Sequence, residues 1–158
     1  MKPRERINIA SSKENIVEVE NFVQDIFDFY RIERDFFGNI ILATTEAFEN
    51  SVVHGNKNNT SKFVSLFYEY NPEKLIIEVK DEGDGFSESD INDPTLSDND
   101  KKGLFLIKML SDNVAFHEDE AMVSMSFKVN CIHSDEYHRR IKLLNIYFDK
   151  VKQKVENE

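Results

Sequence analysis

Two strand-like stretches joined by a short turn constrain the fold of this chain most. They span residues 62–70 and 74–80 and are rich in β-branched and aromatic side chains. The intervening Asn71-Pro72-Glu73 has the composition of a tight turn, which predicts an antiparallel hairpin. Because a hairpin is stable only when one face is covered, the rest of the chain must supply a second layer.

The patterns on either side of the hairpin supply that layer. A short strand is expected at 6–9, helices with apolar faces at 16–27 and 35–54, a helix from Gly103, and strands at 113–117 and 122–130. Ser11-Ser12 followed by Glu14 is a capping signal for the first helix, and Gly55 is expected to end the second in a left-handed conformation. This order predicts an α+β, two-layer α/β sandwich, with helices packed on one face of a mixed, mainly antiparallel sheet.

The segment 134–158 has a different pattern and is predicted to be a C-terminal helical extension of a domain spanning 1–133. Its apolar residues repeat at steps of four and three, as in a helix seam: Tyr137, Ile141, Leu144, Phe148, Val151 and Val155. Two interpretations stay open. The helix packs on its own domain, with Leu143, Ile146 and Tyr147 widening the stripe, or it forms a homodimer or partner contact.

Length and charge exclude several function classes. The 158 residues suffice for one domain, and 30 acidic against 20 basic residues give a net charge of −10. Such a balance argues against a nucleic-acid surface and against docking on an anionic membrane. Cys131 is the single cysteine, and no apolar run approaches the ~18 residues of a membrane span, so a cytoplasmic protein is expected.

Glu46, Asn50 and His54 form the first polar cluster of interest. Steps of four residues place them on one stripe of the helix expected at 35–54, beside apolar positions. A carboxylate, an amide and an imidazole at the edge of a buried face are costly unless they are used. The alternative is a solvated face with a helix cap.

Two glycine-containing segments follow. Asp81-Glu82-Gly83-Asp84-Gly85-Phe86 comes directly after a predicted strand, where glycines let a ligand approach the backbone and Asp81 can accept a hydrogen bond from an exocyclic amine. In Lys101-Lys102-Gly103-Leu104, a glycine that opens a helix would offer free N–H groups to an anion, next to two lysines. An acidic turn and a basic helix start are the ordinary alternatives.

Taken in this order, the three segments resemble the GHKL-type ATP-binding domain over about residues 5–130, and within it the anti-sigma-factor serine/threonine kinase family. The N-box is matched by the ten residues from Glu46 to Gly55, the first Gly box by those from Asp81 to Phe86, and the second by Gly103-Leu104-Phe105-Leu106-Ile107. The resemblance implies a Bergerat-type ATP-binding fold and a partner-switching role.

The resemblance also implies roles for individual residues, with ATP and Mg²⁺ as cofactors. Asn50 would be the metal ligand, Asp81 would bind the adenine amino group, and Glu46 would be the catalytic base. The segment 87–102 would be a lid over the phosphates. The remaining ATP-binding residues would be Gly83, Gly85, Lys101, Lys102, Gly103 and Leu104.

The implied partners are a small antagonist protein, phosphorylated on a serine, and a sigma factor. The chain departs from the family pattern at Lys101, where a glycine is usual, and at Ala121-Met122, where Gly-Thr is frequent. These departures motivate the alternative of a non-catalytic nucleotide-binding or partner-binding module. A histidine-kinase catalytic domain is a weaker third interpretation.

Two metal sites are disfavoured by spacing. In the acidic segment 90–100, Pro94 and Thr95 occupy positions where a calcium loop needs a ligand and a glycine. Cys131, His133 and His138 have no fourth zinc ligand at a matching spacing.

Overall fold

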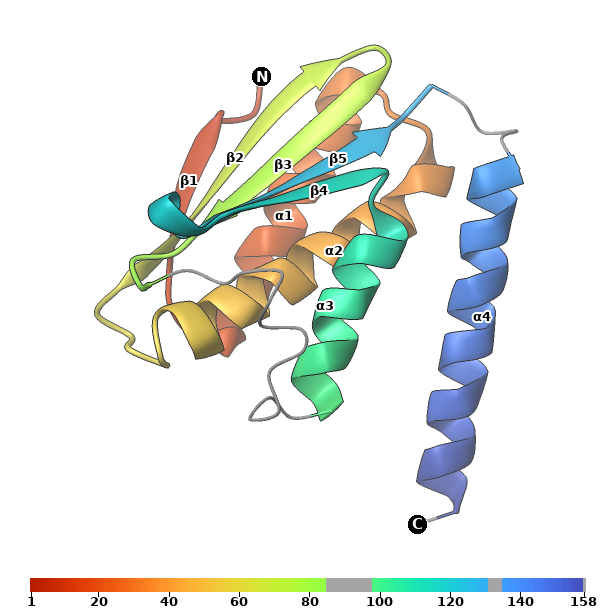
Figure 1. The fold of residues 1–158 in the computed structure, drawn as a ribbon. Coiled ribbons are helices and arrows are strands. Elements are labelled where there is room, and N and C mark those ends of the chain that lie inside the picture. The colour runs from red at the N-terminus through yellow and green to blue at the C-terminus, as the bar shows by residue number, and fades with distance from the viewer. Residues whose placement is uncertain (85–97, 131–134, 158) are drawn as a thin grey trace.

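The structure is a computed structural model that describes residues 1–84, 98–130 and 135–157 (Figure 1). The sequence-predicted features at Gly85, Phe86, Cys131 and His133, and most of the segments 87–102 and 90–100, lie outside these residues.

A five-stranded sheet forms one layer, in the order β1-β2-β3-β5-β4. Its strands are β1 (Arg6–Ala10), β2 (Phe63–Asn71), β3 (Lys74–Lys80), β4 (Asn113–His117) and β5 (Met122–Lys128). Each neighbouring pair is antiparallel, so the sheet expected to be mixed is antiparallel throughout the described residues. The β2–β3 turn forms as predicted, with the Asn71 side-chain oxygen accepting from the N–H groups of Glu73 and Lys74, both at 2.9 Å.

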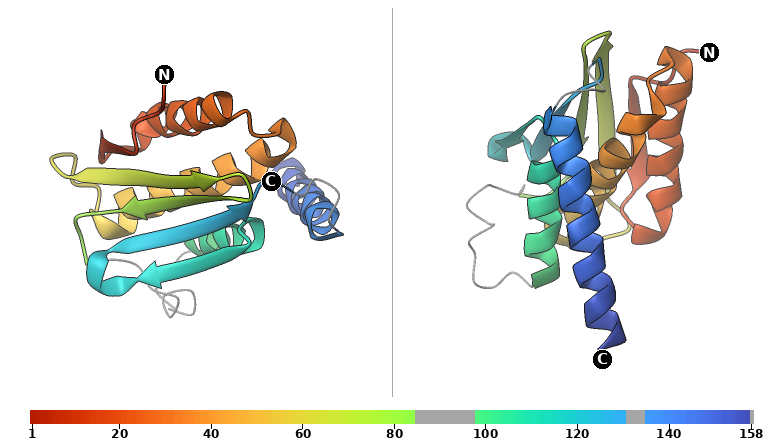
Figure 2. Two further views of the ribbon diagram at one scale, coloured as in Figure 1. Left: turned by 90° about the horizontal axis from the view of Figure 1, so that it is seen from above. Right: turned by 90° about the vertical axis from the view of Figure 1, so that its right-hand side faces the viewer.

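Helices form the second layer, on one face of the sheet (Figure 2). They are the 3₁₀ turn η1 (Lys13–Asn15), α1 (Ile16–Tyr30), the 3₁₀ turn η2 (Arg34–Phe36), α2 (Phe37–Asn50), the π-helical turn η3 (Ser51–Gly55) and α3 (Asp98–Leu110). The 3₁₀ turn η5 (Glu118–Glu120) connects β4 to β5, and α4 (Asp135–Glu156) lies beside α3. The predicted two-layer α+β sandwich is therefore confirmed.

The core lies between these layers and follows the periodicities read from the sequence. On β3, Leu75, Ile77 and Val79 are buried at every second position. The helices contribute large fully buried side chains, among them Phe27 of α1 and Phe48 of α2. One face of each element is thus apolar and covered, as the two-layer arrangement requires.

Three predicted helix boundaries are wrong. Neither Ser12 nor Asn15 caps a helix through its side chain, and the Asn15 amide instead donates to the carbonyl oxygen of Ala10 at 2.9 Å. Left-handed φ angles after α2 occur at Lys57 and Asn58, at 53° and 58°, rather than at Gly55. Helix α3 starts at Asp98 instead of Gly103.

Helix α4 packs on its own domain. Leu144 is buried in the core cluster and Tyr147 packs against it while partly buried. Ile146, which was expected to widen the buried stripe, is 43% exposed, and Phe148 and Val155 of the seam are also exposed. Of the five seam residues whose side chains the structure describes, Phe148 and Val155 therefore face solvent and Leu144 is buried.

None of the helices in the described part of the chain is long and apolar enough to span a membrane.

Candidate functional site

The end of α2 and the loop after β3 meet through two glycines. A Cβ atom on Gly83 would lie 1.8 Å from the carbonyl oxygen of Gly55, and a Cβ on Gly55 would lie 2.2 Å from both Cγ and Oδ2 of Asp81. Side chains at these positions would collide with backbone or with a buried carboxyl group. The N-box and the first Gly box therefore fit together only because both positions are glycine.

Asn56 fastens the same junction and is 1% exposed. Its amide nitrogen donates to Ser11 Oγ at 3.1 Å and to the Phe63 carbonyl at 3.0 Å, and its side-chain oxygen accepts from the Glu82 N–H at 2.8 Å. Three segments that are distant in sequence are thereby tied to one side chain. Asn56 directly follows the N-box and lies outside all three matched motifs.

Asp81 is held at this junction in a buried position, 6% exposed. Its backbone N–H donates to the Ala121 carbonyl at 3.0 Å, and its Oδ1 accepts from the Gly83 N–H at 2.8 Å. Burial raises the pKa of the Asp81 carboxyl, while the Gly83 hydrogen bond opposes this shift. The side chain is a fixed acceptor at the end of a strand.

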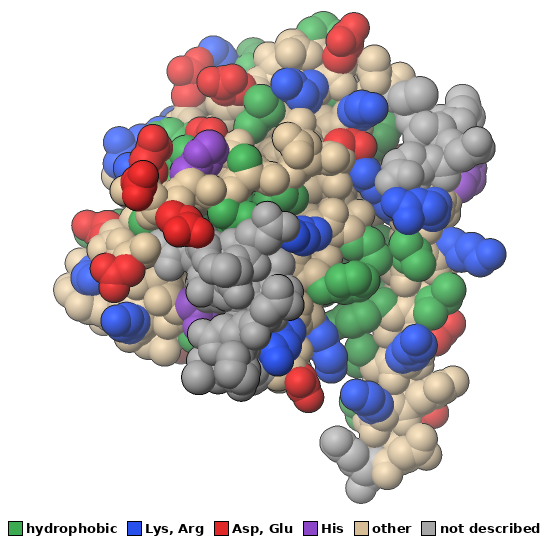
Figure 3. Space-filling view, viewed as in Figure 1, with side chains coloured by type: hydrophobic (Ala, Val, Ile, Leu, Met, Phe, Trp, Pro, Cys, Tyr) green, Lys and Arg blue, Asp and Glu red, His purple; other side chains and the backbone are tan. Residues whose placement is uncertain are grey.

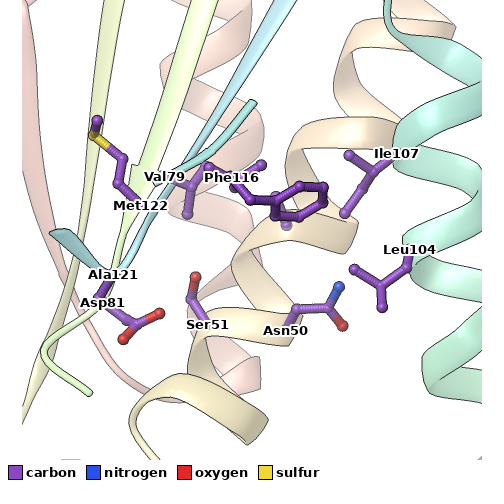
Figure 4. A pocket seen from close by; sticks show the side chains of 11 residues that line it. Asn50, Ser51, Val79, Asp81, Leu104, Ile107, Phe116, Ala121 and Met122 are labelled. Atoms are coloured by element: carbon purple, nitrogen blue, oxygen red, sulfur yellow. The ribbon is translucent and has the colours of Figure 1, made fainter. Parts of the chain in front are cut away.

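Asp81 lines a small space, which we call the inner cavity (Figure 4). Its floor is a row of residues paired across β3, β5 and β4, in which Val79 faces Val123 and Val123 faces Phe116. Leu104 and Ile107 of α3 close the opposite side. The full lining is Ala47, Asn50, Ser51, Val79, Asp81, Leu104, Ile107, Phe116, Ala121, Met122 and Val123.

The inner cavity has a volume of about 20 Å³, enough for roughly one water molecule. Ala121, at the position where the resembled family often has glycine, adopts a left-handed φ of 52°. The backbone thus keeps the conformation that glycine favours although the residue is alanine.

A second space, the outer pocket, lies on the other side of Asn50 and has a volume of about 300 Å³. Glu46 and Asn50 reach it from successive turns of α2, with Lys13 of η1 and Lys102 of α3 also in its wall. The full lining is Lys13, Glu46, Glu49, Asn50, Val53, Asn99, Lys102, Gly103, Leu106 and Tyr147.

The electrostatics of the outer pocket centre on Glu46. Partial burial raises the pKa of the Glu46 carboxyl, the neighbouring Glu49 raises it further, and Lys13 lowers it. A carboxyl whose pKa is raised in a pocket is a common feature of general acids and bases. Lys13 is a cation of this pocket that sequence reasoning missed, because it precedes the matched motifs by more than thirty residues.

Asn50 lies between the two spaces and lines both. Its side-chain nitrogen is buried and has no hydrogen-bond partner among residues 1–84, 98–130 and 135–157. An unsatisfied buried amide costs about 1–3 kcal/mol, so this position is poorly explained by stability alone.

Gly103 lies inside α3, five residues after its start, so its N–H does not open a helix as predicted. It instead allows α3 to lie against α2, since a Cβ here would be 2.7 Å from Glu46 Oε2 and 3.6 Å from Asn50 Oδ1. In this structure the Gly103 N–H is part of the helix, and a role for Gly103 in binding phosphate stays a prediction.

The structure thus gathers Glu46, Asn50, Lys102 and Gly103 around the outer pocket. Asn50, Asp81 and Leu104 line the inner cavity, and Gly83 contacts Gly55 beside it. Lys101 and His54, the latter in the π-helical turn, line neither space within the described residues. Phe116 and Tyr147 were missed, because only the packing of β4 and α4 brings them to the site.

Comparison with protein families gives a match over residues 9–127 to the histidine kinase-like ATPase domain. This match covers most of the chain and includes every residue that lines the inner cavity. The chain belongs to this family.

Among solved structures, this histidine kinase-like ATPase domain is similar to the histidine kinase domain of the blue-light activated histidine kinase from Erythrobacter litoralis EL346. The two are 17% identical, with a TM-score of 0.47, and the match covers 77% of this chain and 62% of that one. The chain therefore corresponds to somewhat less than two thirds of that structure. Comparison with curated proteins found no match.

The residues of this ATPase domain fit ATP and Mg²⁺ as ligands. Gly55 and Gly83 provide a junction that a Cβ would fill, and Asp81 presents a buried acceptor beside an apolar cavity. Asn50 offers an amide oxygen, the kind of donor that Mg²⁺ prefers, between that cavity and the outer pocket. The inner cavity is too small for an adenine ring in this conformation, so nucleotide binding requires it to widen.

Proposed function

We propose that this ATPase domain is a serine/threonine protein kinase of the anti-sigma-factor type. In this proposal it binds Mg²⁺ and ATP, phosphorylates a serine on a small antagonist protein, and binds a sigma factor in a partner-switching circuit. The observation that carries the proposal is the position of Glu46 next to Asn50. A half-buried carboxyl with a raised pKa lies one helical turn from the candidate metal ligand, in one pocket.

Each end of the site has a chemical role in the proposal. Asp81 accepts a hydrogen bond from the adenine amino group. The adenine ring would lie between Val79 on the sheet and Ile107 on α3. The Asn50 side-chain oxygen would hold Mg²⁺, which would supply positive charge to the nucleotide phosphates. Lys13 and Lys102 offset the acidity of Glu46 and Glu49 where the phosphates would lie.

Glu46 is suited to the proton transfer. In its ionised form it orients the acceptor serine and takes the proton from the hydroxyl. The serine oxygen forms a bond to the γ-phosphorus, the bond to the β,γ-bridging oxygen breaks, and ADP leaves with that electron pair. The burial that raises the pKa of Glu46 makes its carboxylate a stronger base.

A non-catalytic module remains the second candidate, and one observation favours it. Helix α3 packs so closely on α2 that the Gly103 backbone covers Glu46 and Asn50. Lys101 stands in the first turns of α3, where the family usually has glycine. Because lysine favours a helix more than glycine does, these turns unwind less easily. In this alternative, nucleotide binding selects a partner without phosphotransfer.

Two measurements separate the candidates. Titration with a fluorescent ATP analogue, with and without Mg²⁺, tests binding, and Asp81→Asn is the matched variant expected to lose it. Incubation with labelled ATP and the antagonist protein tests transfer. The kinase proposal predicts phosphoserine that is lost in Glu46→Gln while binding is retained. Binding without phosphoserine would favour the second candidate, and no binding would contradict the kinase and leave only a partner-binding module.

A further inference from the structure

Helix α4 forms part of the wall of the outer pocket. Tyr147, near the middle of this helix, lines the pocket with Glu46, Asn50 and Lys13. No residue of α4 lines the inner cavity, within the described ranges. The helix therefore lies next to the candidate base and away from the end of the site where adenine would bind.

A largely buried ion pair docks the first half of α4. Arg140 is 9% exposed and its guanidinium lies 3.0 Å from Asp112 Oδ1, in the turn between α3 and β4. The same guanidinium donates to the Ser111 carbonyl at 3.3 Å. Asp112 is itself held in place, because its second oxygen accepts from the Lys128 N–H at 2.6 Å. One turn further along α4, Leu144 enters the core.

The second half of α4 is weakly held. Between residues 138 and 157, Arg140 and Leu144 are the buried side chains, and each of the others is at least partly exposed. Few buried contacts mark a segment whose local opening costs much less than global unfolding. The docked position of α4 is therefore one that a competing surface can displace.

Charge supports both docking and displacement. Helix α4 has six basic and four acidic residues, whereas the whole chain has 20 basic and 30 acidic ones. The space-filling view shows lysine and arginine side chains along α4 and hydrophobic side chains gathered where its middle meets the domain (Figure 3). A basic helix on an acidic domain is attracted to it, and another acidic surface can compete.

We propose that α4 is an access gate for the outer pocket, which restricts the approach of large acceptors to Glu46 and does not cover the adenine end of the site. The covering of the pocket follows from Tyr147, Leu144 and Arg140 and does not depend on catalysis. The further role of α4, to control which protein serine reaches Glu46, rests on the proposed kinase function.

A thiol at position 46 reports access directly. In a full-length chain with Cys131→Ser, Glu46→Cys provides a single thiol in the pocket that Tyr147 lines. Its labelling rate is measured with small N-ethylmaleimide and with a maleimide attached to a large polyethylene glycol. The large reagent reacts more slowly than the small one even with an unfolded chain. If α4 is a gate, the ratio of the two labelling rates should be far larger in the folded protein.

Leu144→Asp releases the gate in this background, and Val155→Asp is the matched control, because Val155 is 68% exposed on the same helix. We expect Leu144→Asp to speed labelling by the large reagent about tenfold, since burial of a leucine is worth at least the free energy of one tenfold step. The control should change it little. Tyr147→Ala, which removes one side chain from the pocket wall and leaves α4 docked, should also speed labelling by the large reagent. It replaces Leu144→Asp as the test if that variant does not fold.

Equal labelling rates in Leu144→Asp, Tyr147→Ala and the control would overturn the gate. So would large-reagent labelling of the parent chain as fast as that of an unfolded chain. The assay uses no nucleotide, so failure to bind ATP would contradict the proposed function without affecting this result. Unchanged affinity for a fluorescent ATP analogue in Leu144→Asp is expected, and a loss comparable to that in Asp81→Asn would contradict the separation of the two ends.

Discussion

Gly83 and Gly55 are in backbone contact across the site, because a Cβ on Gly83 would lie 1.8 Å from the Gly55 carbonyl oxygen. This contact joins the loop after β3 to the π-helical turn that ends α2. A π-helical turn within an α-helix is uncommon and is frequently found at functional sites. Here it carries Gly55 to the position that both Asp81 and Gly83 require.

We therefore expect Gly83→Ala to damage both stability and nucleotide binding. The added methyl group meets backbone and not a flexible side chain, so the junction must shift, at a cost of roughly 1–3 kcal/mol. Urea denaturation measures this loss, and titration with a fluorescent ATP analogue measures the loss of affinity.

Gly38→Ala is the control for this substitution. Gly38 lies in α2 with nothing within 4 Å of its Cβ position, so alanine should gain up to about 1 kcal/mol from helix propensity. Equal effects of the two substitutions on stability would contradict the close contact between Gly55 and Gly83.

Glu46→Gln should make the protein more stable at neutral pH while removing phosphotransfer. Burial raises the folded-state pKa of Glu46, so the folded state binds more protons than the unfolded state between the two pKa values. Stability then falls as pH rises through that window, and the loss persists above it. Glutamine has no such proton to release.

The measurement is urea denaturation of both proteins across a pH series. The stability advantage of Glu46→Gln should be present at neutral pH and vanish once the pH falls below the ordinary glutamate pKa. Glu69→Gln, on an exposed glutamate of β2, should show no such advantage. An advantage that grows toward low pH would contradict the raised pKa of Glu46.

Asn56→Ala should unfasten the loop that carries Gly83. It leaves partners at Ser11, Phe63 and Glu82 without their hydrogen bonds, and each unsatisfied buried group costs about 1–3 kcal/mol. Asn56→Asp keeps the acceptor for the Glu82 N–H but loses both donated bonds, so it separates the two contributions. Hydrogen exchange at residues 81–84 should become faster in both variants, and more so in Asn56→Ala than in Asn56→Asp. Asn113→Ala, on an exposed residue of β4, should leave the exchange rate there unchanged.

Lys13→Gln should weaken the binding of ATP more than that of adenosine. Lys13 lines the outer pocket and not the inner cavity, so its charge acts where the phosphates are proposed to lie. Because the side chain is exposed, the effect should be modest, about fivefold in ATP affinity. Competition titrations at low and high salt measure the loss of affinity, with Lys74→Gln on the distant hairpin as control. An equal loss of affinity for adenosine would contradict a position of Lys13 near the phosphates.

Much of the fold was predictable because it depends on local patterns. The alternation of Leu75, Ile77 and Val79 and the turn at Asn71-Pro72-Glu73 identify the hairpin. The apolar stripes of α1 and α2 identify the covering layer. Helix ends were less predictable, since the π-helical turn after Asn50 and the early start of α3 depend on contacts with other elements.

The candidate site shows the same division. Motif spacing singled out Glu46, Asn50, Asp81 and Gly83, because their order along the chain carries the family pattern. Lys13, Asn56, Phe116 and Tyr147 belong to no such pattern. They reach the site through η1, the turn after α2, the edge strand β4 and α4, and no short-range signal marks them.

The sequence by itself determined the layers of this protein, the positions of Glu46 and Asn50 one turn apart on α2 and the family to which it belongs, because periodicity and motif order are properties of the chain. The tertiary structure decided that Gly103 covers Glu46 instead of opening a helix, that the inner cavity is narrow, and that α4 turns Leu144 and Tyr147 inward while Phe148 and Val155 face solvent. Those outcomes depend on how helices pack against one another, which local sequence leaves open.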